Sequence, residues 1–437
     1  VSFDGWKLGN SDLKITKRGY ADDERTIVLG WGSNPIGEQG LVATGEQFTF
    51  VLNDWQSGNP VTSAEAVAGE NIAKSDDSGK IILTVGQDDI SSVEVTVSAE
   101  GYRDEVVSGA KLDQEEIQLQ MVPGRKHAFV SNRSGQFDIY GIDVDGMNEA
   151  LLLSATGQER DVPTLLPHPT RSFAALVSSR DGEQNGDGFV LDGLFILDEM
   201  TGDTKKITRS EQIRLVGWSG DNLIYWQVVE GKSAGNPERS KLISYNERTG
   251  ESIDLASANY FNDVELVDGI VYYAVSSFAV PQSQAKLFSI NVDGSDRQTR
   301  IDSQVWNIFR PEYNELLFSA VDQKWFRLDE SGTIVETDRQ NSVQSRQFVD
   351  LPDGSKTAWV DIRDGKGVLL VSDTDEIVEE QVVTLPGLNT ALYWLNDDTL
   401  VFRVISNSET ADYVINLTAG EALKVTDVTA SQRNFFF

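Results

Sequence analysis

The sequence predicts an all-β protein of two domains, a β-sandwich near the N-terminus followed by a seven-bladed β-propeller. Three observations carry this prediction. Short stretches of alternating apolar and polar residues, separated by turn residues and without a helical stretch, fill the first part of the chain. After residue 125, a strand-and-turn unit occurs seven times. The unit recurs about every 45 residues, the length expected of a four-stranded blade.

Composition and charge exclude several classes of function. The 437 residues include 37 Lys and Arg against 69 Asp and Glu, so the formal charge is −32. Such acidity argues against nucleic acid and against anionic membrane surfaces as partners, and it permits divalent cations. The absence of cysteine excludes disulfides, thiolate metal sites and cysteine nucleophiles. With only His127 and His168 present, a polyhistidine metal centre is excluded as well.

Signals for cellular location are few. No run approaches the ~18 apolar residues of a membrane helix, and no basic-then-apolar signal opens the chain. The chain begins with Val1 rather than Met, which has two interpretations. Either an upstream signal or anchor has been removed, or the start is a recombinant boundary. The first interpretation predicts an extracytoplasmic, periplasmic or cell-surface protein, attached to a membrane only through the absent upstream segment.

The first domain is expected over residues 41–122. An extended N-terminal arm over 1–40 precedes it, and one interpretation is that this arm adds a strand to the domain. Four stretches of this domain alternate with a period of two, as half-buried strands do: 47–52, 80–85, 93–97 and 117–121. Clusters of Gly, Asn, Asp, Ser and Pro separate them. This pattern predicts a small β-sandwich.

Part of this domain resembles a known family. The order of motifs is Ser-Gly-Asn-Pro-Val at 57–61, Ser-Asp-Asp-Ser-Gly-Lys at 75–80, and Val-Thr-Val-Ser-Ala-Glu-Gly-Tyr at 95–102. It is similar to carboxypeptidase-regulatory-like and related surface β-sandwich modules. In those modules the Gly-Tyr pair marks a turn into a closing strand, so the resemblance implies a structural role for Gly101 and Tyr102.

The second domain is predicted over 126–437, joined by the linker Val122-Pro123-Gly124-Arg125. In each repeat an apolar strand runs into a polar turn, and the turns end at residues 146, 202, 250, 294, 332, 375 and 420. The first repeat starts at His127 without an inner strand before it. The chain ends in an apolar stretch, Arg433-Asn434-Phe435-Phe436-Phe437, which we expect to supply the missing strand and close the ring.

The repeat itself resembles the TolB type, which is related to Trp-Asp repeats. The resemblance rests on the motif at 129–135, on Asp138-Ile139-Tyr140, and on Asp145-Gly146, and residues 177–182 restate its first half. TolB-type propellers commonly have six blades, whereas this sequence has seven units. Members of the group bind proteins or peptides in the periplasm or serve as accessory domains to peptidases. No peptidase domain follows within the sequence, which weakens any enzymatic function that the resemblance implies.

The most specific candidate site is an acidic loop in the second blade. Oxygen-bearing side chains occupy positions 1, 3, 5, 7 and 12 of a twelve-residue window: Asp181, Glu183, Asn185, Asp187 and Asp192. Glycine at position 6 completes the spacing of an EF-hand loop, which suits calcium. Gly188 at position 8 and an aspartate at position 12 depart from that pattern. The alternatives are a calcium site on a β-scaffold and a solvated acidic insertion.

Other candidates have simpler interpretations. The Asp-Val-Asp-Gly element at 143–146 and the Asn-Val-Asp-Gly element at 291–294 fall at strand turns, where Asp and Asn bond the backbone and Gly supplies positive φ. His127 is predicted to be packed in an apolar strand, and His168 to lie on an inner-strand loop. Four tryptophans occur near the start of a blade and are expected to pack between blades, with stacking on a ligand as the alternative: Trp218, Trp306, Trp359 and Trp394.

Length variation among the repeats suggests a function. Three insertions, at 181–193, 230–240 and 277–286, all fall between the second and third strands of their blades. We therefore predict a non-enzymatic extracytoplasmic recognition or scaffolding protein that presents these loops to a protein or glycan. The alternative is a carbohydrate-active hydrolase or lyase that uses paired carboxylates near the propeller axis. The spacing of carboxyl groups at the axis discriminates between the two classes.

Overall fold

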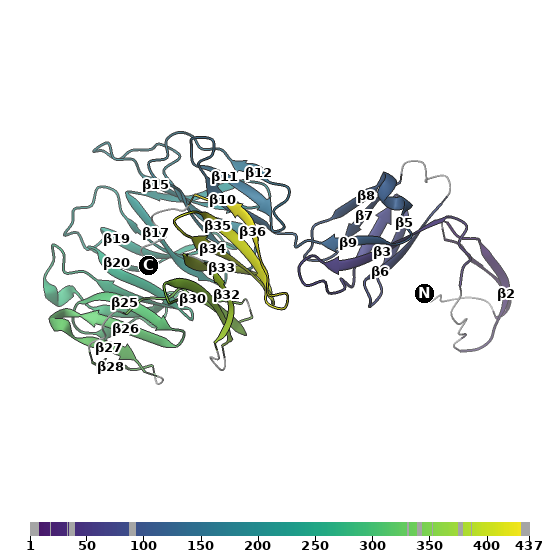
Figure 1. Cartoon of the computed structure of the whole chain (residues 1–437). Coiled ribbons are helices and arrows are strands. Elements are labelled where there is room, and N and C mark those ends of the chain that lie inside the picture. Colours follow the sequence, from purple (N-terminus) through teal and green to yellow (C-terminus); the bar gives the residue numbers. More distant parts are fainter. Residues whose placement is uncertain are drawn as a thin grey trace. The chain divides into compact units, whose positions relative to one another are not determined.

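A computed structural model confirms the all-β fold class. It describes residues 8–17, 19–32, 34, 40–86, 93–329, 332–338, 343–351, 353–374, 379–385 and 387–429. The chain divides into two compact units, 1–124 and 125–437, which are described separately below (Figure 1). Over the described ranges, no helix has the length and apolarity that crossing a bilayer requires.

The N-terminal arm forms a hairpin of its own. Strands β1 (Gly9–Ile15) and β2 (Asp23–Leu29) pair as an antiparallel two-stranded sheet, which does not join the sheets of the sandwich over the described residues. Most of its side chains are exposed, and Leu13 is its buried apolar residue. Over the described residues, the expectation that the arm adds a strand to the sandwich is therefore wrong.

The sandwich of the first unit packs a three-stranded sheet on a four-stranded one. The order of the first sheet is β6-β3-β9 and that of the second is β5-β4-β7-β8. The strands are β3 (Glu46–Asp54), β4 (Glu65–Ala68), β5 (Asn71–Lys74), β6 (Lys80–Val85), β7 (Glu94–Ser98), β8 (Glu105–Ser108) and β9 (Ile117–Met121), with a 3-10 turn η2 (Gly109–Asp113) before β9. Alternate residues of β3, namely Phe48, Phe50 and Leu52, enter the shared core, as a period of two requires.

The second unit contains seven antiparallel sheets in chain order. The first has three strands and the other six have four each. The first three sheets are β10 (Lys126–Ser131), β11 (Asp138–Asp143) and β12 (Ala150–Leu153); β13 (Thr164–Pro167), β14 (Phe173–Ser178), β15 (Asp192–Asp198) and β16 (Thr204–Ser210); and β17 (Gln212–Ser219), β18 (Asn222–Val228), β19 (Ser240–Asn246) and β20 (Ser252–Ala258).

The remaining four sheets repeat the same order. They are β21 (Phe261–Val267), β22 (Ile270–Val275), β23 (Leu287–Asn291) and β24 (Gln298–Ile301); β25 (Val305–Glu312), β26 (Glu315–Ala320), β27 (Trp325–Leu328) and β28 (Ile334–Thr337); β29 (Val349–Asp350), β30 (Lys356–Arg363), β31 (Lys366–Asp373) and β32 (Glu380–Leu385); and β33 (Leu388–Asn396), β34 (Thr399–Ile405), β35 (Thr410–Asn416) and β36 (Ala422–Asp427). Short 3-10 turns η3 (Gln282–Gln284) and η4 (Val321–Gln323) lie in two of the connections.

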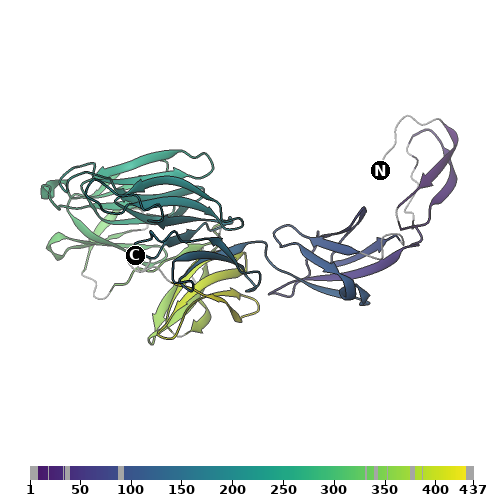
Figure 2. The ribbon, with the colours of Figure 1, turned by 90° about the horizontal axis from the view of Figure 1, so that it is seen from above.

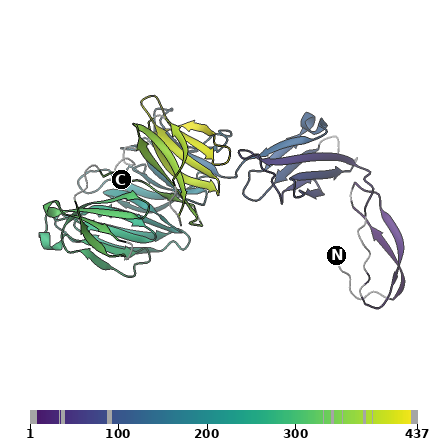
Figure 3. The same cartoon turned by 60° about the horizontal axis from the view of Figure 1, so that its bottom comes forward.

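The sheets are arranged as propeller blades. First strands of neighbouring sheets contact one another, as β17 contacts β21 and β21 contacts β25, so they lie nearest the axis. Second strands such as β14, β18 and β22 are buried almost throughout, whereas fourth strands such as β16 and β32 are largely exposed and form the rim. Figures 2 and 3 show these sheets from two further directions.

The two faces of the propeller carry different connections. Antiparallel strands reverse direction at each step, so all second-to-third-strand connections leave from one face, together with the links between blades. We call this the loop face. First-to-second and third-to-fourth connections leave from the opposite face, which we call the turn face. Arg125, the first residue of the second unit, bonds Glu199 in the β15–β16 turn and therefore lies at the turn face.

The first sheet lies beside the seventh. In Figure 1 the blue β10–β12 sheet lies next to the yellow β33–β36 sheet, and Thr429, after β36, donates a backbone hydrogen bond to Val130 of β10 at 2.7 Å. As the sequence predicts, the first sheet has three strands. The predicted closing strand at 433–437 lies outside the described residues.

Candidate functional site

The three longest second-to-third-strand connections lie on adjacent sheets. They are the loops 179–191, 229–239 and 276–286 of the second, third and fourth sheets. The equivalent connections of the last three sheets are short, at 321–324, 364–365 and 406–409. The predicted insertions therefore lie in the predicted connections. They form one patch on the loop face, which we call the loop patch.

Side chains from the links between blades hold the loop patch in place. Glu211, between β16 and β17, accepts hydrogen bonds at 3.2 Å from both Asn185 Nδ2 and the backbone N–H of Gly231, so it joins two of the loops. In the next link, Asn259 donates to the carbonyl of Phe278. In the third loop, Ser277 donates to Gln304 Oε1 at 2.8 Å. The backbone of the loop patch is thus ordered before any partner binds.

Two phenylalanines stand out from the loop patch. Phe189 in the first loop is 68% exposed, and Phe278 in the third loop is 62% exposed. Large apolar side chains on a pinned backbone lose little conformational freedom on binding, which is the behaviour of interface anchors. Val190 follows Phe189 directly, and Ala279 and Val280 follow Phe278, so each phenylalanine belongs to a short apolar stretch of its loop.

Basic side chains already occupy the acidic end of the candidate calcium loop. Asp181 and Glu183 both pair with Lys206, and Glu183 also pairs with Arg209. Hydrogen bonds from Arg209 and then Lys206 lower the pKa of Glu183. The structure therefore brings Asp181 and Glu183 together around a lysine of the rim strand β16.

Two of the other predicted ligands, Asn185 and Asp192, form hydrogen bonds within the protein. Asn185 Oδ1 accepts the N–H groups of Asp187 and Phe189 and closes a turn of the loop. Asp192 is 1% exposed and accepts from Arg160 and from the N–H of Ile213 in the next sheet. No group of three potential metal ligands occurs within the described part of the chain. Calcium binding stays a prediction.

A thermal melt in EDTA and then in calcium tests this prediction. If calcium binds, the midpoint rises by an amount set by RT ln(1 + [Ca²⁺]/Kd). Asp181→Ala then abolishes the rise, and Asp203→Ala in the neighbouring turn, outside the window, preserves it. If the ion pairs are the only role of the loop, wild type gives the same midpoint in both media.

Both histidines have structural roles. His127 is 1% exposed and bonds Asp412 through Nε2 at 2.6 Å and the Tyr393 hydroxyl through Nδ1 at 2.8 Å, which links the first sheet to the seventh. His168, in the turn after β13, accepts two backbone N–H groups at Nδ1 and bonds the carbonyl of Gly220 through Nε2. Burial lowers the pKa of His168 to about 4, so this histidine is neutral at pH 7.

The tryptophans divide into two groups. Trp218 and Trp394 each donate an indole N–H to a carbonyl on the first strand of the preceding sheet, at 3.2 and 2.9 Å, as inter-blade packing predicts. Trp359 is buried, but its Nε1 has no partner. Trp306, at the start of β25, is 46% exposed and does not fit the packing prediction.

An inner strand carries the carboxyl pair that comes nearest to the enzymatic alternative. Asp263 and Glu265 lie two apart on β21. Asp263 is held by the N–H groups of Ile308, at 2.7 Å, and Val264, at 2.9 Å. Burial and then repulsion from Asp263 raise the pKa of Glu265 to about 7, against the opposing charge of Arg310. The carboxyl group of Asp263 thus links two blades through its hydrogen bond to Ile308. The carboxyl group of Glu265 changes protonation near neutral pH.

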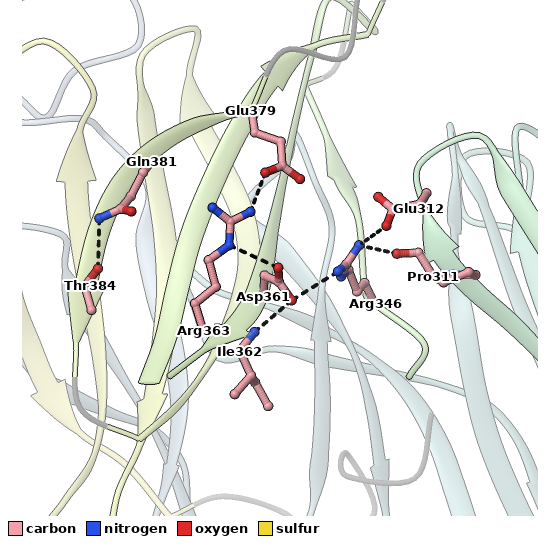
Figure 4. A network of polar contacts seen from close by, with 9 residues as sticks. All are labelled: Pro311, Glu312, Arg346, Asp361, Ile362, Arg363, Glu379, Gln381 and Thr384. Carbon is pink, nitrogen blue, oxygen red and sulfur yellow. Dashed lines mark hydrogen bonds and ion pairs between the residues drawn. The ribbon is translucent and has the colours of Figure 1, made fainter. Parts of the chain in front are cut away.

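A polar brace joins the fifth sheet to the sixth (Figure 4). Arg346, from the segment before β29, donates to Glu312 at 2.7 Å and to the carbonyl of Pro311, and on its other side to Asp361 at 3.1 Å. Arg363 also bonds Asp361. Burial alone favours the protonated acid, but Arg363 and Arg346 hold the pKa of Asp361 below its usual range. The brace fixes the segment that carries Phe348.

Sequence patterns did not reveal the residues that organise these sites. Glu211, Asp412 and Arg310 acquire their roles through contacts with other blades. A usable signal was present for two of them, because a charged residue inside an apolar strand must find a buried partner. Asp412 follows Ala411 and precedes Tyr413-Val414, and Arg310 follows Ile308-Phe309.

Fold and site together define an all-β protein whose propeller presents long, pinned loops on one face. No family model matches the chain, and a search of curated proteins found no match. Solved structures similar to it include TolB and other β-propeller proteins, at 10–12% identity in the three cases below.

A prolyl endopeptidase has a TM-score of 0.41 and 12% identity, over 69% of this chain and 49% of that one, so this chain spans about half its length. TolB from Acinetobacter baumannii has a TM-score of 0.35 and 12% identity, over 68% of this chain and 78% of that one. The propeller domain of the trilobed protease from Pyrococcus furiosus has a TM-score of 0.39 and 10% identity, over 87% of this chain and 97% of that one. Likenesses of this degree do not bear on function.

Proposed function

We propose that this protein is a non-enzymatic recognition or scaffolding protein that works outside the cytoplasm and binds a protein or glycan partner through the loop patch. The observation that carries the proposal is the placement of the three longest loops on adjacent blades and on one face. Shared hydrogen bonds through Glu211 pre-order two of these loops, which lowers the entropic cost of binding. Phe189 and Phe278 supply the apolar anchors.

The test compares matched exposed side chains on the two faces. In a binding assay with envelope proteins and glycans, we expect Phe189→Ala combined with Phe278→Ala to weaken partner binding at least tenfold, about 1.4 kcal/mol. Met147→Ala removes a side chain that is 61% exposed in a turn-face connection and serves as the control. Equal binding by wild type and the double variant contradicts the proposal, as does a loss of binding confined to Met147→Ala.

One observation favours a second candidate, a carbohydrate-active hydrolase or lyase. Glu265, with a pKa of about 7, is suited to general acid–base chemistry near neutral pH. Its neighbour Asp263 is engaged by two backbone N–H groups, which leaves this candidate without a second free carboxyl group on the strand. Polysaccharide cleavage that Glu265→Gln abolishes would favour the enzyme over the recognition protein.

A further inference from the structure

A buried arginine between the fifth and sixth sheets is only partly satisfied. Arg310 is 6% exposed, and its guanidinium lies 4.9 Å from the ring centre of Tyr313 and 4.6 Å from that of Phe348. Its Nε donates to the Tyr313 carbonyl at 3.1 Å, but Nη2 has no hydrogen-bond partner. Over the described ranges, no carboxylate forms an ion pair with Arg310. Burying an unpaired cation destabilises the folded state, unless an anion binds to the cation and offsets the cost of removing it from water.

One more buried donor near Phe348 lacks a hydrogen-bond partner, Trp359 Nε1. The hydroxyl of Thr357 hydrogen-bonds the carboxyl group of Asp350. Asp350 and Thr357 are opposite each other in the β29–β30 ladder, and the Trp359 ring lies 5.5 Å from that of Phe348. We call Arg310, Tyr313, Phe348, Asp350, Thr357 and Trp359 the Arg310 cluster. Unsatisfied buried donors are rare in folded proteins, and two of them, on Arg310 and Trp359, belong to side chains that lie against the same ring of Phe348.

The chemistry of these atoms specifies the ligand. Arg310 and Trp359 offer N–H donors, and the rings of Tyr313 and Phe348 hold the guanidinium group of Arg310 in place. A planar fork of N–H groups matches the two oxygens of a carboxylate. Tyr313, Phe348 and Asp350 are partly exposed, whereas Arg310, Thr357 and Trp359 are buried.

We propose that the Arg310 cluster binds the carboxylate group of a small ligand, with Arg310 as the principal donor and Trp359 as an additional donor. This site is separate from the loop patch and independent of the proposed function. Arg346, whose side-chain contacts Figure 4 shows, also donates its backbone N–H to the carbonyl of Arg310 at 2.9 Å, and Phe348 follows two residues later. The brace therefore holds Phe348 against Arg310.

Neighbouring acids make this binding depend on pH. Glu265 faces Arg310 and Asp263, and its pKa is raised to about 7. Burial and the charge of Asp268 raise the pKa of Asp350, against hydrogen bonds from Thr357 and Tyr313 and the charge of Arg310. When these acids are protonated, the positive charge of Arg310 is unopposed. Carboxylate affinity should therefore be highest below pH 7 and should fall as Glu265 ionises above it.

The experiment uses a matched pair of probes on the full chain. N-acetylglycine carries the carboxylate, and N-acetylglycinamide replaces it by a neutral amide. Calorimetric titration at about pH 6 should show the acid binding at least tenfold more tightly than the amide, with the preference reduced at about pH 8. Equal binding of acid and amide, or binding of neither, overturns the proposal, since ordered water then satisfies the cluster.

Variants assign the effect to the cluster. Arg310→Gln should abolish the preference for the acid, whereas Arg363→Gln, in the brace but outside the cluster, should retain it. Trp359→Phe keeps the ring, loses one donor and should weaken binding severalfold, which preserves the test if Arg310→Gln fails to fold. Glu265→Gln should retain binding and flatten its pH dependence. A full acid preference in both Arg310→Gln and Trp359→Phe contradicts the assignment.

Discussion

Replacing Asp412 by alanine should destabilise the propeller by about 3–5 kcal/mol, the cost of removing one partner from a buried ion pair. Asp412 is fully buried on β35 and accepts from Arg403 at 2.7 and 3.0 Å and from His127 at 2.6 Å. The variant leaves the guanidinium of Arg403 and the imidazole of His127 without their anion. Since His127 lies on β10 and Asp412 on β35, the contact between the first and seventh sheets weakens as well.

Chemical denaturation measures this effect. The matched control is Asp398→Ala, which removes an ion pair of 3.1 Å to Lys356 from a side chain that is 52% exposed. Exposed pairs contribute about 0–1 kcal/mol, so this variant should unfold close to wild type. If Asp412→Ala and Asp398→Ala unfold at the same denaturant concentration, the buried network does not hold the ring together.

The same network sets a response to acid. Burial favours the protonated form of Asp412, but Arg403 and His127 outweigh it and hold its pKa far below the ordinary value. A depressed folded pKa means that the stabilisation is complete above about pH 4, the usual value for an unfolded aspartate, and is lost as the pH falls further. Wild type and Asp412→Asn should differ most at neutral pH and converge in strong acid.

Phe50→Ala should destabilise the sandwich by about 3–5 kcal/mol and leave the propeller transition unchanged. Phe50 is fully buried in the middle of β3, and its core cluster consists only of residues of the first unit. Removing the ring leaves a cavity that the surrounding strands cannot fill. Because the two units have separate cores, calorimetry should resolve a shift in one of two transitions.

Ile82→Ala is the control for this variant. Ile82 lies on the neighbouring strand β6, opposite Thr49, and is 50% exposed. Its truncation should cost much less, because most of the removed surface is already in water. Equal shifts for Phe50→Ala and Ile82→Ala, or a single transition that moves as a whole, would contradict the two-core description.

Local patterns were sufficient for the long loops and for four of the seven sandwich strands, and they missed the short strands β4, β5 and β8. Stretches such as 287–290 and 413–416 run directly into Asn- or Gly-bearing turns, so the repeating unit was visible without long-range information. The three insertions appeared as extra length between known strands. The hairpin at Gly9–Leu29 was less predictable, because its few apolar residues follow no sustained period and only Leu13 is buried.

Local sequence patterns could not predict contacts between residues that lie far apart in the chain. His127 and Asp412 are separated by 285 positions, and Arg310 meets Phe348 only because successive blades adjoin. The acidic loop shows the opposite limitation. Its spacing matched a metal loop, whereas the basic partners Lys206 and Arg209 come from the following strand and enter no loop motif. Side-chain partners across a sheet depend on register, which composition does not report.

The most direct test of the recognition proposal is a hydrogen-exchange footprint of the protein with its bound partner. We predict slowed exchange over 179–191, 229–239 and 276–286, and unchanged exchange in the turn-face connections 144–149 and 247–251. Protection confined to the turn face, with the three loops exchanging as in the free protein, would contradict the assignment of the loop patch as the binding surface.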